Sequence, residues 1–366
     1  MQSHRSGTDD RNLDVLRTIA VLLVLVGHTL NATIAPESVR PFLGILGNDG
    51  VIIFFVHTSL VLMRSLERTR ARGLHGWTRA KDFYVRRAFR IYPLAVLTVL
   101  AVVSLKLRRE PLDLQFIPPG SVEIAANLTL TQNLLGERTV LAPLWSLPYE
   151  IQMYALLPLL FIFVRRAKSK WQLIALAALS IAVAHVYLGL TAWVPIIWRL
   201  SVINYLPCFA AGIIAYRACQ LTRPRIAAGA WPIVVLLVVF GSPLIRSAMM
   251  NEFKRGWFVA FAVAAFIPLV HELPESAFTR AAHVVAKYSY GIYLSHMPVL
   301  EIAVRWMQQE PLWLRILAAT AGLIVLPFLL YHSVEQPMIT VGSGVASRLS
   351  RRRAVAPTLA STAPVP

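Results

Sequence analysis

Ten apolar segments, each of about 20 residues, restrict the fold of this chain more than any other feature of its sequence. A helix of that length crosses the hydrocarbon core of a bilayer while keeping its backbone polar groups paired. The predicted spans cover residues 13–31, 45–63, 83–105, 145–164, 171–190, 196–216, 228–245, 256–271, 286–306 and 312–333. Charged residues make up 15% of the chain, compared with about 25% in soluble domains. The sequence therefore predicts an all-α integral membrane protein, with about ten transmembrane helices around a polar intramembrane cavity.

The basic residues predict the orientation of these spans. The net charge is +18, but Lys and Arg cluster between the apolar segments and form no single stripe, which argues against a nucleic-acid partner. With the N-terminus in the cytoplasm, 25 of the 36 Lys and Arg residues lie in the inner segments. This asymmetry agrees with the positive-inside rule. We expect a multi-pass protein in the lipid bilayer, with the N- and C-termini both cytoplasmic.

The sequence indicates one membrane domain followed by a short tail. Residues 1–340 contain all ten predicted spans and show no internal repeat. Residues 341–366 contain three consecutive arginines, Arg351 to Arg353, and are otherwise rich in Ala and Pro. This composition favours a disordered cytoplasmic tail whose arginines lie against anionic lipid. The spacing of the cysteines and histidines matches no metal-binding pattern, so we expect no metal site.

Arg17 and His28 share one face of the first predicted span. They are eleven residues apart, which is almost three helical turns and about 16 Å along the helix axis. Ionisable residues inside a membrane are costly, and by default they mark a functional site. His28 lies about 22 Å from the cytoplasmic side, in the outer half of the bilayer.

Glu150 lies on the fourth predicted span, about 8 Å below the outer face, at a depth that overlaps that of His28. A histidine and a carboxylate in a low dielectric can form a general base and its orienting partner. We therefore predict that His28 and Glu150 are catalytic. Trp145 and Ser146 lie one turn nearer the outer surface, and Tyr154 lies one turn deeper on the face of Glu150. Trp145 could instead belong to an interfacial aromatic belt.

Arg87 and Arg90 are three residues apart, and therefore on one helix face, at the cytoplasmic end of the third predicted span. Arg86, beside them, is interpreted as a topology signal. An arginine drawn into the membrane edge suits a phosphate, because its planar fork binds phosphate through two parallel hydrogen bonds. Arg17 lies at a similar depth on the first span. We predict that Arg17, Arg87 and Arg90 form an anion site at one cytoplasmic mouth.

Two further histidines lie inside predicted spans. His57 falls in the second span and could line the same cavity or pack as a satisfied core residue. His296 falls in the ninth span, on a segment rich in tyrosine and serine. That segment could face a polar cavity, or it could pack on its neighbours through small and hydroxyl residues. For both histidines the two interpretations stay open.

Five separated motifs, in this order, resemble the bacterial membrane acyltransferase type 3 family. The segment LDVLRTIAVLLVLVGH is similar to the family's first helix, with the same spacing from arginine to histidine. YVRRAFRIYP resembles its Arg-x-x-Arg element, and WSLPYEIQMYALLP resembles its Trp-Ser-Leu, Glu and Tyr segment. YSYGIYLSHMPV resembles a helix near the C-terminal end, and EQP resembles the closing turn. The resemblance covers about residues 11–340.

The resemblance implies an enzyme of the bacterial inner membrane that acylates hydroxyl groups of surface or exported polysaccharides. The donor would be cytoplasmic acyl-CoA, with acetyl-CoA as the leading candidate. It would be a substrate and not a bound cofactor. Its phosphates would dock on Arg87 and Arg90, with Arg17. His28 would act as the base, or would carry the acyl group as a covalent relay, and Glu150 would orient His28 or bind the sugar.

Several side chains are expected next to the substrate. The resemblance implies that Trp145 could stack on a sugar ring, and the other residues expected at the substrate are Ser146, Tyr154, His57 and His296. Expected partners are acyl-CoA, a glycan acceptor and the bilayer, with other polysaccharide-biosynthesis proteins as further candidates.

Alternatives to the glycan acceptor stay open. The segment FFVHTSLVL departs from the family pattern, because His57 replaces an apolar residue and Ser59 replaces a glycine. This change leaves the acyl length and the choice of acceptor open. The acceptor could be a small molecule or a lipid. A transporter of lipid-linked glycan is the remaining alternative, although transporters of this size often show internal repeats.

Overall fold

The computed structural model describes residues 10–33, 36–110, 113, 115–245 and 251–355. Most of these residues are helical, and the one extended pairing among them is an isolated bridge between Ile226 and Val270. Within the described ranges, seven helical stretches are long and apolar enough to cross a membrane: Arg11–Thr33, Arg40–Ala71, Gly76–Ser104, Ala142–Val164, Lys170–Thr191, Ile196–Leu221 and Leu312–Ser350. The prediction of an all-helical, multi-pass membrane protein is confirmed.

The predicted number of ten spans is not confirmed. α9 (Ala230–Gly241) has 12 residues and α10 (Glu252–Phe266) has 15, whereas a span needs about 20. α11 (Ala277–Glu301) has 25 residues, but its polar residues keep it outside the seven apolar stretches. The three remaining predicted spans stay predictions, as does the polar cavity that the ten helices would surround.

The chain folds as two compact units, each built from two separate stretches of sequence. Unit 1 combines Met1–Leu60 with Ala167–His296, and unit 2 combines Val61–Arg166 with Met297–Pro366. α2 (Arg40–Ala71) and α11 contribute residues to both units.

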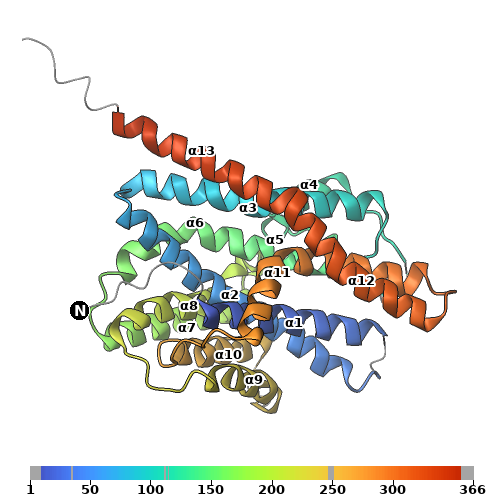
Figure 1. Cartoon of the computed structure of the whole chain (residues 1–366), viewed down its shortest axis with the longest axis horizontal. Helices are drawn as coiled ribbons and strands as arrows, with labels where there is room; N and C mark the ends of the chain where they lie inside the picture. The colour runs from blue at the N-terminus through green and yellow to red at the C-terminus, as the bar shows by residue number, and fades with distance from the viewer. Residues whose placement is uncertain (1–9, 34–35, 111–112, 114, 246–250, 356–366) are drawn as a thin grey trace, which may run out of the picture. The chain divides into compact units, whose positions relative to one another are not determined.

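Unit 1 holds α1 and the first part of α2, followed by a group of helices from the middle of the chain. That group consists of α7 (Lys170–Thr191), η2 (Pro195–Leu200), α8 (Val202–Leu221), α9, η3 (Ser242–Ile245), α10 and most of α11 (Figure 1). α1 (Arg11–Thr33) approaches α2 through glycines. A Cβ atom at Gly27 would lie 2.8 Å from the Leu43 carbonyl oxygen, and one at Gly50 would lie 2.6 Å from the Ala20 carbonyl oxygen. This close approach lets polar side chains of α1 reach the surface of α2.

Unit 2 is organised around α3 (Gly76–Ser104), which runs beside α13 (Gln336–Val355) in Figure 1. A Cβ atom at Gly342 of α13 would lie 2.5 Å from the Phe89 Cβ atom, so the two helices touch at that glycine. The other elements are α4 (Ser121–Thr129), α5 (Gln132–Leu135), η1 (Ala142–Trp145), α6 (Leu147–Val164), η4 (Ile302–Trp306), α12 (Leu312–Leu330) and η5 (Tyr331–Glu335).

The segment after residue 340 corrects one prediction. We expect disorder over 341–366, but α13 continues to Val355, so the part up to that residue is helical. Packing against α3 supplies the stabilisation that the local composition does not predict. Residues 356–366 lie outside the described residues.

Candidate functional site

His28 is held in one tautomer by its own helix. Its Nδ1 atom lies 2.9 Å from the Val24 carbonyl oxygen. A carbonyl oxygen can only accept, so Nδ1 carries the proton and Nε2 of the neutral ring carries the lone pair. No hydrogen bond to Nε2 is found among the described residues. Gly47 leaves room beside the ring, since a Cβ atom there would lie 3.6 Å from Cε1 of His28. This arrangement suits a general base.

His296 lies beside His28. The two ring centroids are 5.1 Å apart, with the rings inclined at 60°. His296 is completely buried, and its Nδ1–H donates to the Tyr293 carbonyl oxygen at 2.8 Å. Its Nε2 atom is buried and has no hydrogen-bond partner within the part of the chain that the structure describes. Both imidazoles therefore offer an acceptor nitrogen, and a buried acceptor of this kind favours a ligand that brings a hydrogen-bond donor.

Arg17 is half-buried and lies against α11. Its Nε–H donates to the Ser289 hydroxyl oxygen at 2.5 Å, and that hydroxyl donates to the Ala286 carbonyl oxygen at 2.8 Å. In unit 1, α1 and α11 thus meet at two places, at Arg17 with Ser289 and at His28 with His296. The sequence predicts Arg17, His28 and His296 as site residues but does not predict the contact between the two histidines.

In α2, Ser59, which stands where the family pattern has a glycine, has a local packing role. Ser59 is completely buried and donates to the Phe55 carbonyl oxygen at 2.7 Å. It packs against Gly212 of α8, where a side chain would collide with the Ser59 hydroxyl. His57 is buried with 4% of its surface exposed. A role for His57 at the substrate stays a prediction.

Unit 2 contains a cavity of about 250 Å³ with a strongly cationic wall. Five arginines line it: Arg68, Arg72, Arg86, Arg87 and Arg90. Arg68 lies near the end of α2, Arg72 lies in the turn that follows it, and the other three arginines lie in the first half of α3. The remaining lining residues are Ser65 and Thr69 of α2 and Ile339 and Ser343 of α13. So many donors around one hollow, with their planar forks, suit a ligand that carries several phosphate charges.

Acidic side chains neutralise part of this wall. Arg90 forms an ion pair with the buried Glu335 at 3.3 Å. Arg86 donates to Asp82 and to the Ser343 hydroxyl, both at 2.9 Å. In contrast, Arg68 and Arg72 make no side-chain hydrogen bond or ion pair with any described residue. These two arginines, at the end of α2 and in the turn after it, retain donors for a ligand, and the sequence does not predict them as site residues.

The segment around Glu150 forms a compact polar group in unit 2. Tyr154 donates its hydroxyl proton to Oε2 of Glu150 at 2.7 Å, as the four-residue spacing predicts. Trp145 packs edge-to-face on Tyr149, with the ring centroids 5.9 Å apart. Ser146 is buried. The predicted pairing of Glu150 with His28 joins residues of the two units and stays a prediction, as does the predicted place of Arg17 beside Arg87 and Arg90.

The sequence does not predict two buried ion pairs that the structure contains. In unit 1, Arg255 pairs with Asp49, whose carboxylate also accepts from the Ser242 hydroxyl at 2.6 Å. In unit 2, Arg108 pairs with Glu301 at 2.9 Å. Asp49 and Glu301 fall inside predicted spans, and an ionisable residue there marks a special site by default. That signal could have identified both acids, but not their partners.

The fold and these residues define a multi-pass membrane protein that carries a histidine pair and a cationic cavity. The comparison with protein families then gives the family: a model described as an acyltransferase domain matches residues 10–332. The chain therefore belongs to the acyltransferase 3 family of membrane acyltransferases. It is also similar to nodulation protein 10 of Rhizobium leguminosarum bv. viciae, with 25% identity over 95% of this chain and 98% of that protein. No solved structure matches this chain.

Proposed function

We propose that this protein is an O-acyltransferase of the bacterial inner membrane. It moves an acyl group from cytoplasmic acyl-CoA to a hydroxyl of a surface or exported polysaccharide, or of its lipid-linked precursor. Acetyl is the proposed acyl group. The proposal places both termini in the cytoplasm, as the distribution of basic residues predicts.

The observation that carries the proposal is the cavity lined by five arginines. Coenzyme A presents its phosphates at one end and its thioester at the other, so a donor site needs concentrated positive charge away from the chemistry. Arg68 and Arg72 supply that charge beyond the two arginines that pair with Asp82 and Glu335, and Arg87 is a further cation of the wall. Arg17 is the further candidate for a phosphate contact.

His28 is the proposed base. Its Nε2 lone pair takes the proton of the acceptor hydroxyl as the hydroxyl oxygen attacks the thioester carbonyl carbon. The carbon–sulfur bond then breaks, the coenzyme A thiolate leaves, and the imidazolium of His28 returns the proton to that sulfur. The products are the ester and free coenzyme A. His296 offers a second acceptor nitrogen next to His28, and Glu150 is the proposed carboxylate partner of His28 or of the sugar.

A covalent relay is the other chemical route. Nε2 of His28 would attack the thioester, release coenzyme A and hold the acyl group until the acceptor hydroxyl removes it. Mass spectrometry of protein incubated with acetyl-CoA alone separates the two routes, because only the relay leaves an acetyl group on the peptide that contains His28.

Four side chains complete the proposed acceptor region. Trp145 can stack on a sugar ring through its indole face, and Ser146, Tyr154 and His57 can contribute hydroxyl or imidazole contacts.

The function is tested by the O-acyl content of surface polysaccharide from cells that lack this protein. Complementation with the wild type should restore the O-acetyl groups, and complementation with His28→Ala should not. His185→Ala is the matched control, because His185 lies on an exposed face of α7 and should complement fully. If O-acylation never depends on the protein, the polysaccharide acceptor is wrong. Coenzyme A release by the purified protein would then distinguish an acyltransferase for small molecules or lipids from a transporter.

A further inference from the structure

A second cavity of unit 2 lies at the opposite end of α3 from the arginine-lined one. Its floor includes Val102 and Val103 in the last turn of α3, twelve residues or more beyond Arg90, which is about 18 Å along the helix axis. The cavity has a volume of about 350 Å³, within the range of small-molecule sites.

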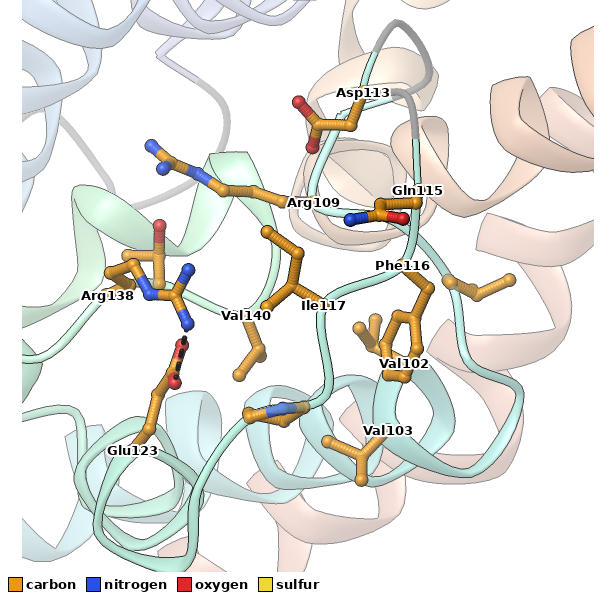
Figure 2. A pocket seen from close by; sticks show the side chains of 13 residues that line it. Val102, Val103, Arg109, Asp113, Gln115, Phe116, Ile117, Glu123, Arg138 and Val140 are labelled. Atoms are coloured by element: carbon orange, nitrogen blue, oxygen red, sulfur yellow. Dashed lines mark hydrogen bonds and ion pairs between the residues drawn. The ribbon is translucent and has the colours of Figure 1, made fainter.

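The lining combines an apolar floor with a polar rim, as Figure 2 shows. Val102, Val103 and Phe116 gather at one side of the view, while Arg109 and the pair of Arg138 and Glu123 lie on the other. Arg138 lies 3.3 Å from Glu123. The side chain of Arg109 is exposed and has no hydrogen-bond or ion-pair partner among the residues described.

The walls are tied in place by buried groups. Arg108, next to Arg109, pairs with the buried Glu301 of α11 and also donates to the Asp113 carbonyl oxygen. The opposite wall is fixed by Asn127, whose side chain donates to the Arg138 carbonyl oxygen at 2.8 Å and accepts from the Val140 amide at 3.1 Å. A pocket held this way needs little rearrangement to bind a ligand.

The charge pattern distinguishes this cavity from the arginine-lined one. Here guanidinium donors and carboxylate acceptors stand around one hollow. Each hydroxyl of a sugar both donates and accepts, so a sugar ring can use both kinds of group, and the CH face of the ring can lie on the apolar floor. A lipid chain would leave the Arg109 guanidinium without a partner, and an anion would meet the Glu123 carboxylate.

We propose that this cavity binds a sugar ring of the acceptor glycan, with Arg109 and the Arg138–Glu123 pair contacting its hydroxyls. The proposal rests on the function proposed above. It places donor and acceptor sites at opposite ends of one helix that is long enough to span the bilayer.

The test uses the full chain in lipid nanodiscs and a labelled oligosaccharide probe. The probe is prepared from the surface polysaccharide of the same cells after alkaline removal of its O-acetyl groups. Arg109→Ala and Glu123→Gln should each raise the dissociation constant of the probe about tenfold or more. Arg199→Ala is the matched control, because Arg199 is an exposed arginine of η2 in unit 1, and it should leave binding unchanged.

Failure of this inference can be separated from failure of the proposed function. If the wild type acetylates the probe from acetyl-CoA, but Arg109→Ala changes neither the dissociation constant nor the acceptor KM, the cavity is not the acceptor site. Displacement of the probe by inorganic pyrophosphate would also overturn the inference, because it would make the cavity an anion site. If the wild type neither binds the probe nor releases coenzyme A, the proposed function and the inference both fall. Arg109→Ala keeps the fold, since the side chain it removes is exposed.

Discussion

The histidine pair of unit 1 and the arginine-lined cavity of unit 2 differ in the groups that they offer to a ligand: the first offers neutral acceptors, and the second offers cationic donors. Around His28 and His296, the Nδ1 protons are bonded to helix carbonyls, and two imidazole nitrogens remain as acceptors. The cavity of unit 2 instead collects five cations, of which Arg86 and Arg90 pair with acidic side chains, while Arg68 and Arg72 make no ion pair with a described residue. The first environment suits the movement of one proton, and the second suits the binding of an anion.

This difference predicts how the two regions respond to substitution. Loss of a group that acts only in the transition state lowers kcat, whereas loss of a group that binds the substrate before and during reaction raises KM. Variants of the histidine region should therefore change kcat, and variants of the arginine-lined cavity should change the donor KM.

The largest expected effect is that of His28→Ala. Removal of the base should lower kcat by about a hundredfold to ten-thousandfold, the usual contribution of general acid–base catalysis. Acetyl transfer by the purified protein measures it, with His185→Ala as the control. Turnover close to that of the wild type would exclude His28 as the base.

Glu150→Gln should have the next largest effect. It removes the charge but keeps an oxygen that can accept from Tyr154. The fall in kcat therefore measures the contribution of the negative charge. We expect kcat to fall about tenfold to a hundredfold. Tyr154→Phe removes the 2.7 Å hydrogen bond and keeps the charge, so its effect should be smaller. Equal, weak effects of the two variants would make Glu150 a structural residue.

Substitutions in the arginine-lined cavity should act on the donor KM. Arg72→Ala removes a guanidinium with no partner in the described part of the protein and should raise the KM for acetyl-CoA about tenfold. Arg90→Lys keeps the charge beside Glu335 but loses the planar fork of the guanidinium, so the lysine variant should bind the donor less tightly than the wild type. A donor KM that both variants leave unchanged, at normal kcat, would contradict the phosphate site.

The smallest expected effect concerns the glycine contact that holds α1 against α2. A Cβ atom at Gly27 would lie 2.8 Å from the Leu43 carbonyl oxygen, whereas nothing lies within 4 Å of one at Gly44. Gly27→Ala should therefore lower the free energy of unfolding by about 1–3 kcal/mol. Gly44→Ala should not lower it. Thermal unfolding in detergent measures both, and equal stabilities would show that α1 and α2 adapt without cost.

The sequence determined the features that depend on local pattern. Hydropathy over about 20 residues identifies the membrane helices, and helical periodicity places Arg87 with Arg90 and Glu150 with Tyr154 on common faces. The same local reasoning failed at residues 341–355, where the basic composition predicts disorder and packing against α3 produces a helix. It also overestimated how well the short and polar segments between 228 and 306 meet the criteria for a span.

Only the tertiary structure decided which distant residues meet. His28 and His296 are 268 residues apart in the chain and lie ring to ring, and Arg90 finds Glu335 across 245 residues. Neither contact produces a periodic pattern in the sequence, because each depends on how whole helices pack. Arg68 and Arg72, at and just after the end of α2, join the arginines of α3 in one cavity for the same reason. The sequence thus determined which ionisable residues the membrane helices carry, and helix packing decided which of them share a site.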